Sequence, residues 1–134
     1  KKNRIPRMKI FNKTENWSSK VNFVDENNVV LGYDVGQCCC EYADWFISDT
    51  IREEIVERTS TSDDTPTDMP GWMFDTSYRK HIEGSDFSDG SMVVFRITKD
   101  NNEKFIHIFN CHNGYYGHGF EFSIGNEQIT SGCI

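Results

Sequence analysis

The last third of the chain, from Ser91 to Ile134, alternates short apolar runs with turn-forming residues, and this pattern restricts the possible folds more than any other feature. Turn residues stand at Asp100 to Asn102 and at Gly125-Asn126, between segments rich in β-branched and aromatic side chains. Because turns of this kind join neighbouring strands, the pattern predicts an antiparallel meander.

Two further strands are expected nearer the N-terminus. Val21 and Phe23 alternate with polar neighbours, which is the period of a half-buried strand. Residues 25–28 supply turn chemistry, and a second strand follows from Val29 to Val35. Gly32 inside this second strand predicts a bulge or a close backbone approach.

The segment 41–58 is the one region that resembles a helix. Tyr42, Trp45 and Phe46 fall close to a 3.6-residue period, and charged residues would form the solvated side. One helical region and about six strands predict an α+β fold, in which a curved antiparallel sheet carries the helix on one face.

The length of 134 residues suits a single domain. Residues 1–19 are polar and basic, and we expect them to precede one α+β domain over residues 20–134.

The formal net charge of −7 argues against direct binding of nucleic acid, because phosphate contacts need clustered Lys and Arg. An acidic surface suits a basic protein partner instead. The chain has no apolar run of the roughly 20 residues that cross a bilayer, so no membrane partner is expected. Five cysteines, three of them contiguous, favour free thiols in a reducing compartment and hence a cytoplasmic location.

Cys38, Cys39 and Cys40 allow four interpretations. They could hold a metal, although zinc ligands are usually spaced by two to four residues. Cys38 or Cys40 could form a disulfide with Cys111 or Cys133, or a cysteine of the cluster could supply a nucleophile. The simplest interpretation is that these small, readily buried side chains fill a tight turn.

Candidate catalytic residues lie in two segments. Cys40, Glu41 and Asp44 fall where the helix is expected to start, which would favour a thiolate and place the two carboxylates on one helix face. His112 and His118 are the candidate bases. Acidic residues in a first helical turn are also explained by the helix dipole alone.

The two histidines flank an Asn113-Gly114 pair, which is a strong signal for a two-residue hairpin. A five-residue loop over 113–117 is the alternative, and it would place His112 opposite His118. With Cys40 these imidazoles are the candidate ligands for zinc, although no cofactor is favoured. The candidates for stacking on a ligand ring are Tyr115, Tyr116 and Trp45.

Two segments, GYDVGQCCCEYADWF and FNCHNGYYGHGFEF, resemble a family of small, functionally unassigned domains from bacteria and phages. The matching motifs are Cys-Cys-Glu-x-Ala-Asp-Trp at residues 39–45 and His-Asn-Gly-Tyr-Tyr-x-His-Gly-Phe at residues 112–120. The resemblance implies no activity. It implies that the two segments belong to one site, and Cys38 departs from the pattern.

Three functions are compatible with these features. The first is a non-enzymatic accessory or interaction domain, with a polar cleft between the Cys38–Asp44 segment and the His112–His118 hairpin. The second is a small Cys- or metal-dependent hydrolase or transferase at that cleft. The third is an acidic inhibitor of a partner protein that handles nucleic acid. No diagnostic catalytic motif is present, so an enzyme is the less favoured class.

Overall fold

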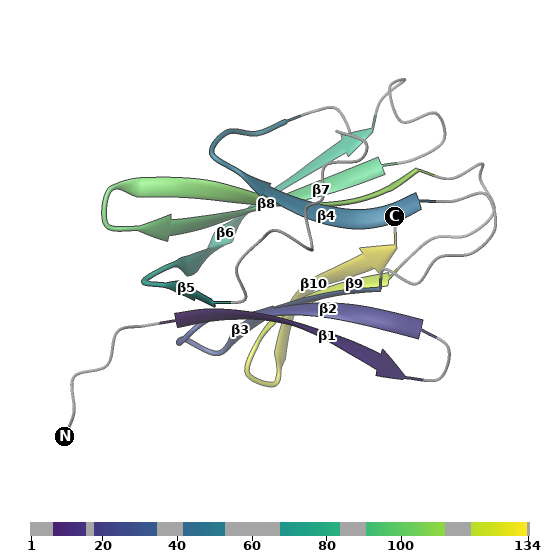
Figure 1. The fold of residues 1–134 in the computed structure, drawn as a ribbon, viewed down its shortest axis with the longest axis horizontal. Coiled ribbons are helices and arrows are strands. Elements are labelled where there is room, and N and C mark those ends of the chain that lie inside the picture. The colour runs from purple at the N-terminus through teal and green to yellow at the C-terminus, as the bar shows by residue number, and fades with distance from the viewer. Residues whose placement is uncertain are drawn as a thin grey trace.

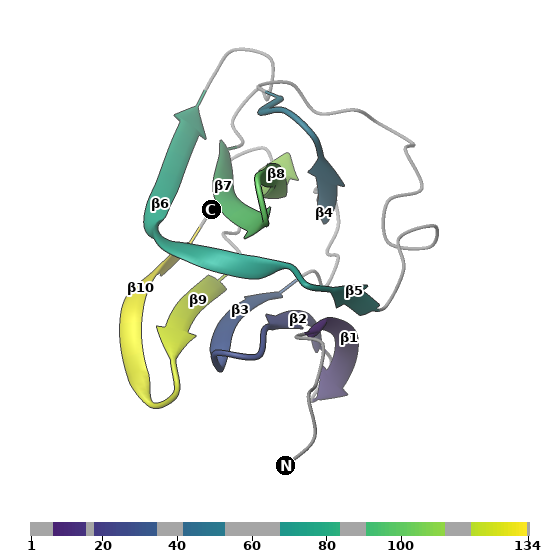
Figure 2. The same cartoon turned by 90° about the vertical axis from the view of Figure 1, so that its left-hand side faces the viewer.

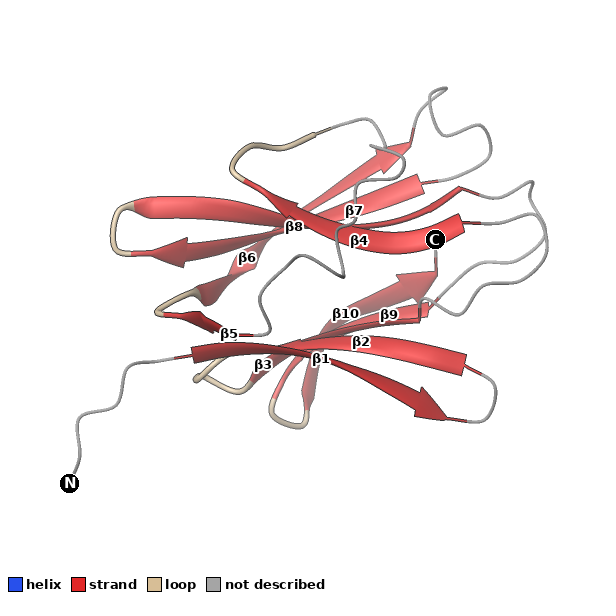
Figure 3. Cartoon of the chain, in the orientation of Figure 1, coloured by secondary structure: helices blue, strands red, loops and turns tan. Residues whose placement is uncertain are grey.

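A computed structural model describes residues 7–15, 18–34, 42–52, 68–83, 91–111 and 119–133. Within these ranges the chain forms β-strands and no helix (Figure 3). The strands are β1 (Arg7–Glu15), β2 (Ser18–Val24), β3 (Val29–Asp34), β4 (Tyr42–Ser48), β5 (Asp68–Pro70), β6 (Met73–Glu83), β7 (Ser91–Lys99), β8 (Asn102–Cys111), β9 (Gly119–Ile124) and β10 (Glu127–Cys133).

The strands form two antiparallel sheets that face each other as a sandwich (Figures 1 and 2). The six-stranded sheet has the order β10-β9-β3-β2-β1-β5, and the four-stranded sheet has the order β4-β8-β7-β6. The prediction of an α+β fold with one sheet and a covering helix is therefore wrong, because the described part of the chain is all-β.

The segment predicted to start a helix forms the edge strand β4, which pairs with β8. Ala43 and Trp45 are buried in the core between the sheets, whereas Phe46 belongs to a second cluster on the other face. A strand buried on both faces loses the alternation of a half-buried strand. The spacing of its apolar residues therefore imitated a helical period. Residues 53–58 of the predicted helix lie outside the described residues.

The predicted hairpin between β8 and β9 is also wrong. β8 pairs with β4 and β7 in the four-stranded sheet, whereas β9 pairs with β3 and β10 in the six-stranded sheet. The segment 112–118 therefore links the two sheets. The two-residue turn and the five-residue loop, which were the alternatives for a β8–β9 hairpin, are therefore both excluded. The argument that such a hairpin places His112 opposite His118 no longer holds.

Several local predictions are confirmed. β2, β3, β7, β8, β9 and β10 lie where strands were expected, and the turns between consecutive pairs fall at the predicted residues. Asn28 (φ 63°), Asp100 (φ 55°) and Gly125 (φ 56°) take the left-handed conformation in these turns. Asn, Asp and Gly are the residue types that reach this conformation at least cost.

The N-terminal segment 1–19, which was expected to precede the domain, contributes a strand to it. β1 pairs with β2 over seven residue pairs, from Lys9 opposite Val24 to Glu15 opposite Ser18. It also pairs with the short strand β5.

The main core lies between the sheets, and its fully buried side chains include Phe23, Leu31, Tyr33, Phe95, Ile97, Ile106, Ile108 and Phe122. A second apolar cluster covers the other face of the four-stranded sheet and contains Phe46, Ile82, Met92, Val94, Phe105 and Phe109. Burying each large apolar side chain contributes about 1.5–3 kcal/mol, so both clusters stabilise the fold. The four-stranded sheet is thus apolar on both faces.

The buried Asp25 ties the β2–β3 turn to the start of β6. Its Oδ1 accepts hydrogen bonds from the backbone N–H groups of Asn27 (2.9 Å) and Val29 (3.0 Å), and its Oδ2 accepts one from Phe74 N–H (2.9 Å). Three backbone donors compensate the burial of the carboxylate.

A bulge bends β6, and the strand pairs with β7 on both sides of the bend (Figure 2). Phe74 pairs with Ile97 and Arg79 with Phe95, so four residues of β6 face the single residue Arg96 of β7.

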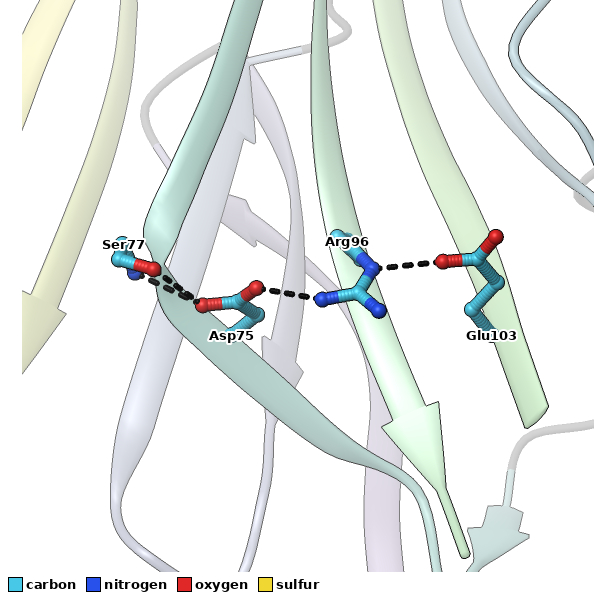
Figure 4. A network of polar contacts seen from close by, with 4 residues as sticks. All are labelled: Asp75, Ser77, Arg96 and Glu103. Carbon is cyan, nitrogen blue, oxygen red and sulfur yellow. Dashed lines mark hydrogen bonds and ion pairs between the residues drawn. The ribbon is translucent and has the colours of Figure 1, made fainter. Parts of the chain in front are cut away.

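Polar contacts hold this bulge (Figure 4). Asp75 Oδ1 accepts from the Ser77 backbone N–H (3.0 Å) and hydroxyl (2.7 Å). Arg96 Nη1 donates to Asp75 Oδ2, and its Nε donates to Glu103 Oε1, both at 2.7 Å. Arg96 therefore links the bulge to the β7–β8 hairpin.

Candidate functional site

Most of the predicted site residues fall outside the described part of the chain. These are Cys38 to Glu41 in the first segment and His112 to His118, including Tyr115 and Tyr116, in the second. The structure describes the residues at both ends of each segment.

In the four-stranded sheet, the two segments attach to directly opposed residues. The first segment ends where β4 begins at Tyr42, and the second begins where β8 ends at Cys111. Tyr42 and Cys111 are Cα partners in the β4–β8 pairing.

In the six-stranded sheet, the same two segments attach to neighbouring strands. Tyr33 of β3 lies opposite Phe120 of β9, so the next residues, Asp34 and Gly119, are also neighbours in this antiparallel pair. Cys133 of β10 is the Cα partner of Gly119 on its other side.

We call the end of the sandwich formed by Asp34, Tyr42, Cys111 and Gly119 the crossing end, because both segments link the two sheets there (right-hand side of Figure 1). The expectation that the Cys and His segments lie near one another is therefore compatible with the strand order. That the Cys and His side chains themselves lie close together stays a prediction.

Asp44 and Trp45 are the predicted site residues that the structure describes. Trp45 is 2% exposed, and its ring meets that of Phe23 edge to face with 5.0 Å between centroids. This packing explains the tryptophan as a core residue. Asp44 is half-buried, and its Oδ1 accepts a hydrogen bond of 2.8 Å from the Trp45 backbone N–H.

This bond satisfies a backbone donor on an edge strand, where such groups are otherwise open to pairing with another chain. The argument that Glu41 and Asp44 share a helix face is wrong for Asp44, because it lies in β4.

The sequence reasoning missed His107, which is fully buried on the outer face of the four-stranded sheet. Its ring stacks on Phe46 at 4.2 Å between centroids, and its Nε2 accepts a hydrogen bond of 3.0 Å from the Arg52 backbone N–H. The ring is therefore neutral with its proton on Nδ1. Nδ1 has no well-formed hydrogen bond to any described residue.

Burial lowers the pKa of His107 from 6.5 to about 4. Backbone groups of Phe105 and Phe46 favour the protonated ring, but burial outweighs them, and the nearby Arg52 charge lowers the pKa further. The signal in the sequence was the unbroken run FIHIF, in which a histidine lies inside a strand that is apolar on both faces.

Within the described ranges, no three His, Cys, Asp or Glu side chains converge in a way that could hold a metal ion. The candidate zinc ligands Cys40, His112 and His118 lie outside those ranges.

A hollow of about 460 Å³ lies on the outer face of the six-stranded sheet, and it reaches the crossing end. We call it the outer-face hollow, and the residues that line it include Lys20, Asp34, Gly119, Glu121, Gln128 and Ser131. Two of these, Asp34 and Gly119, are the attachment points of the Cys and His segments. The hollow therefore reaches the two residues at which the Cys and His segments leave the six-stranded sheet.

No family model, curated protein or solved structure matches this chain. Among the described residues, no helical segment is long and apolar enough to cross a bilayer.

Proposed function

We propose that this protein is a non-enzymatic accessory or interaction domain that binds a protein partner at the crossing end of its sandwich. The observation that carries the proposal is that the Cys38–Asp44 and His112–His118 segments attach to neighbouring strands in both sheets. Binding residues commonly lie on loops that a rigid scaffold positions. As part of the same proposal, we infer a cytoplasmic location and a relationship to the bacterial and phage domains that the two segments resemble.

Site-specific photo-crosslinking tests it. A photoreactive phenylalanine analogue replaces Tyr115 in one variant and Asn126 in the other, because Asn126 lies in the β9–β10 turn at the opposite end of the sandwich. We expect a discrete crosslinked partner from position 115 in a bacterial lysate, abolished by excess unlabelled protein. Equal crosslinking from both positions, or none from position 115, would contradict the proposal.

The second candidate function is a small thiol- or metal-dependent hydrolase or transferase at the same end. The observation in its favour is that Cys111 and Cys133 end their strands there, and that the chain flanking Cys38 to Cys40 attaches there. This function predicts either bound zinc, measured by elemental analysis, or a reactive thiol. Such a thiol would react with a labelling reagent at a pH well below about 8.5, the reference pKa of cysteine. The Cys40→Ser variant should lose that labelling.

The third candidate, an acidic inhibitor of a protein that handles nucleic acid, is supported by the net charge of −7. It predicts that the crosslinked partner itself binds nucleic acid and that added DNA or RNA competes with this chain.

A further inference from the structure

The short stretch that follows β4 is held against the outer face of the four-stranded sheet. We call residues 49–52 the β4 tail. Ile51 packs against the second apolar cluster, and the Arg52 backbone N–H donates a hydrogen bond of 3.0 Å to His107 Nε2. His107 is fully buried, whereas Arg52 is exposed. The bond to His107 therefore fixes the far end of the tail on the sheet.

His107 cannot take up a proton without losing this bond. Its Nε2 accepts the Arg52 N–H through a lone pair, and a proton on that nitrogen would set two donors against each other. Turning the ring over would not restore an acceptor, because Nδ1 already carries a proton. The stack on Phe46, with 4.2 Å between ring centroids, also holds the ring in its orientation. Protonation of the ring and docking of the tail therefore exclude each other.

The described surroundings of the ring offer no carboxylate that would compensate a positive charge. Neither ring nitrogen bonds to one, and the positive charge of Arg52 opposes protonation. The charged groups on the elements around the ring are Asp44 on β4, Asp49 and Arg52 on the tail, Asp75 and Lys80 on β6, Arg96 on β7 and Glu103 on β8. The acidic residues among them already have other hydrogen-bond partners.

We propose that His107 is an acid-sensitive latch, which releases the far end of the β4 tail from the sheet when Nε2 takes up a proton from the solvent. The near end stays anchored, because the hydrogen bond and charge of Lys104 lower the pKa of Asp49 from 3.8. Release takes Ile51 away from the second apolar cluster and uncovers part of it. The latch lies toward the end of β4 that is remote from the crossing end, so it does not depend on the proposed partner.

Release should respond to pH over a definite range. In the docked state burial lowers the pKa of His107 to about 4, and in the released state water reaches the ring and its pKa returns toward 6.5. Release therefore takes up a proton between these two values. The equilibrium constant for release should rise by up to about tenfold per pH unit as the pH falls from 6.5 toward 4, and it should be constant above that range.

Hydrogen exchange followed by NMR tests the latch, because the Arg52 amide is bonded to His107. We expect the protection factor of this amide to fall by up to about tenfold per pH unit below pH 6.5. The Ile106 amide, in a strand that is paired on both sides, is the reference for global unfolding. Low concentrations of urea should speed exchange at Ile106 only, since release of a short tail exposes little surface.

Three variants separate a latch from a merely structural contact. His107→Gln keeps an oxygen that can accept the Arg52 N–H but does not titrate, so protection should no longer depend on pH through this bond. Asp49→Asn weakens the anchor and should lower protection at every pH without changing the slope. His81→Gln removes an exposed histidine from β6 and should behave as the wild type.

An Arg52 amide whose exchange follows that of Ile106 in urea would show that the tail leaves only when the whole domain unfolds, and would overturn the proposal. The same pH slope in His107→Gln as in the wild type would also overturn it. If that variant fails to fold, the wild type decides. The ring ¹⁵N shifts of His107 and the Arg52 amide shift should then titrate with one common midpoint, and separate midpoints would refute the latch.

Discussion

At the scale of single residues, His107 shows how a fold can hold a titratable group in its neutral form. The ring is buried against Phe46 and accepts the Arg52 backbone N–H, and protonation would replace this acceptor with a second donor. The charged groups around it do not favour protonation. The positive charge of Arg52 raises the cost of protonating the ring.

The depressed pKa predicts a loss of stability in mild acid. In the unfolded chain His107 takes up a proton near pH 6.5, but in the folded chain only near pH 4. Unfolding therefore consumes a proton between these values, and stability is fully present above pH 6.5 and falls as the pH drops toward 4. A shift of this size corresponds to about 3 kcal/mol of unfolding free energy.

Denaturant unfolding from pH 7.5 to 4 measures this loss. Carboxylates also titrate in this range, so the comparison is with His107→Gln, whose amide oxygen can accept the same N–H. We expect a shallower pH dependence in this variant and an unchanged one in His81→Gln, since His81 is exposed. A His107→Gln curve parallel to that of the wild type would refute the prediction.

At the scale of elements, polar contacts hold the bulge that interrupts the pairing of β6 with β7. Four residues of β6 lie opposite Arg96 of β7, so the backbone pairing of the two strands is interrupted there. Without the contacts of Asp75, this part of the sheet would be held only weakly. Hydrogen bonds from Ser77, followed by the interaction with Arg96, lower the pKa of Asp75 from 3.8. These contacts are therefore intact at neutral pH and are lost only as the pH falls through that lowered value.

Removing the guanidinium should loosen this element without unfolding the protein. We expect Arg96→Gln to speed hydrogen exchange at the Ser77 amide, because Asp75 would lose one of the groups that orient its carboxylate. The melting temperature should change little, since the ion pairs are partly exposed. Lys99→Gln removes the same charge from β7 outside the network and should leave this exchange unchanged.

At the scale of the whole molecule, apolar packing and a few long-range hydrogen bonds join the two sheets. The Tyr33 hydroxyl on β3 donates to the Phe109 carbonyl on β8 at 2.7 Å, and the two residues are 76 positions apart in sequence. This bond spans the core and lies one residue from the end of β3, near the crossing end.

Deleting that hydroxyl tests its contribution. Tyr33→Phe should lower the unfolding free energy by about 1–2 kcal/mol, because a buried bond is lost while the ring stays packed. Tyr78→Phe is the matched control. Tyr78 packs beside the second apolar cluster, and its hydroxyl makes no hydrogen bond to a described residue. Chemical denaturation of both variants gives the comparison, and equal losses would argue against a specific role for the inter-sheet bond.

The candidate site could be anticipated only in part. The sequence pointed to the Cys and His segments through their residue types, and the strand order brings their attachment points together. It did not point to the outer-face hollow, because Asp34, Gly119 and Glu121 become neighbours only through pairing between β3 and β9. Nor did it identify Trp45 as a core residue, since an aromatic side chain suits a core and a ligand equally well.

The sequence by itself determined the features that depend on neighbouring residues: six of the strands, and the turns at Asn28, Asp100 and Gly125, whose residue types tolerate left-handed backbone. Only the tertiary structure decided that β4 is a strand and that β8 and β9 belong to different sheets. The physical reason is that apolar spacing reports how many faces of a segment are buried. Which partner covers each face depends on contacts between residues far apart in the chain.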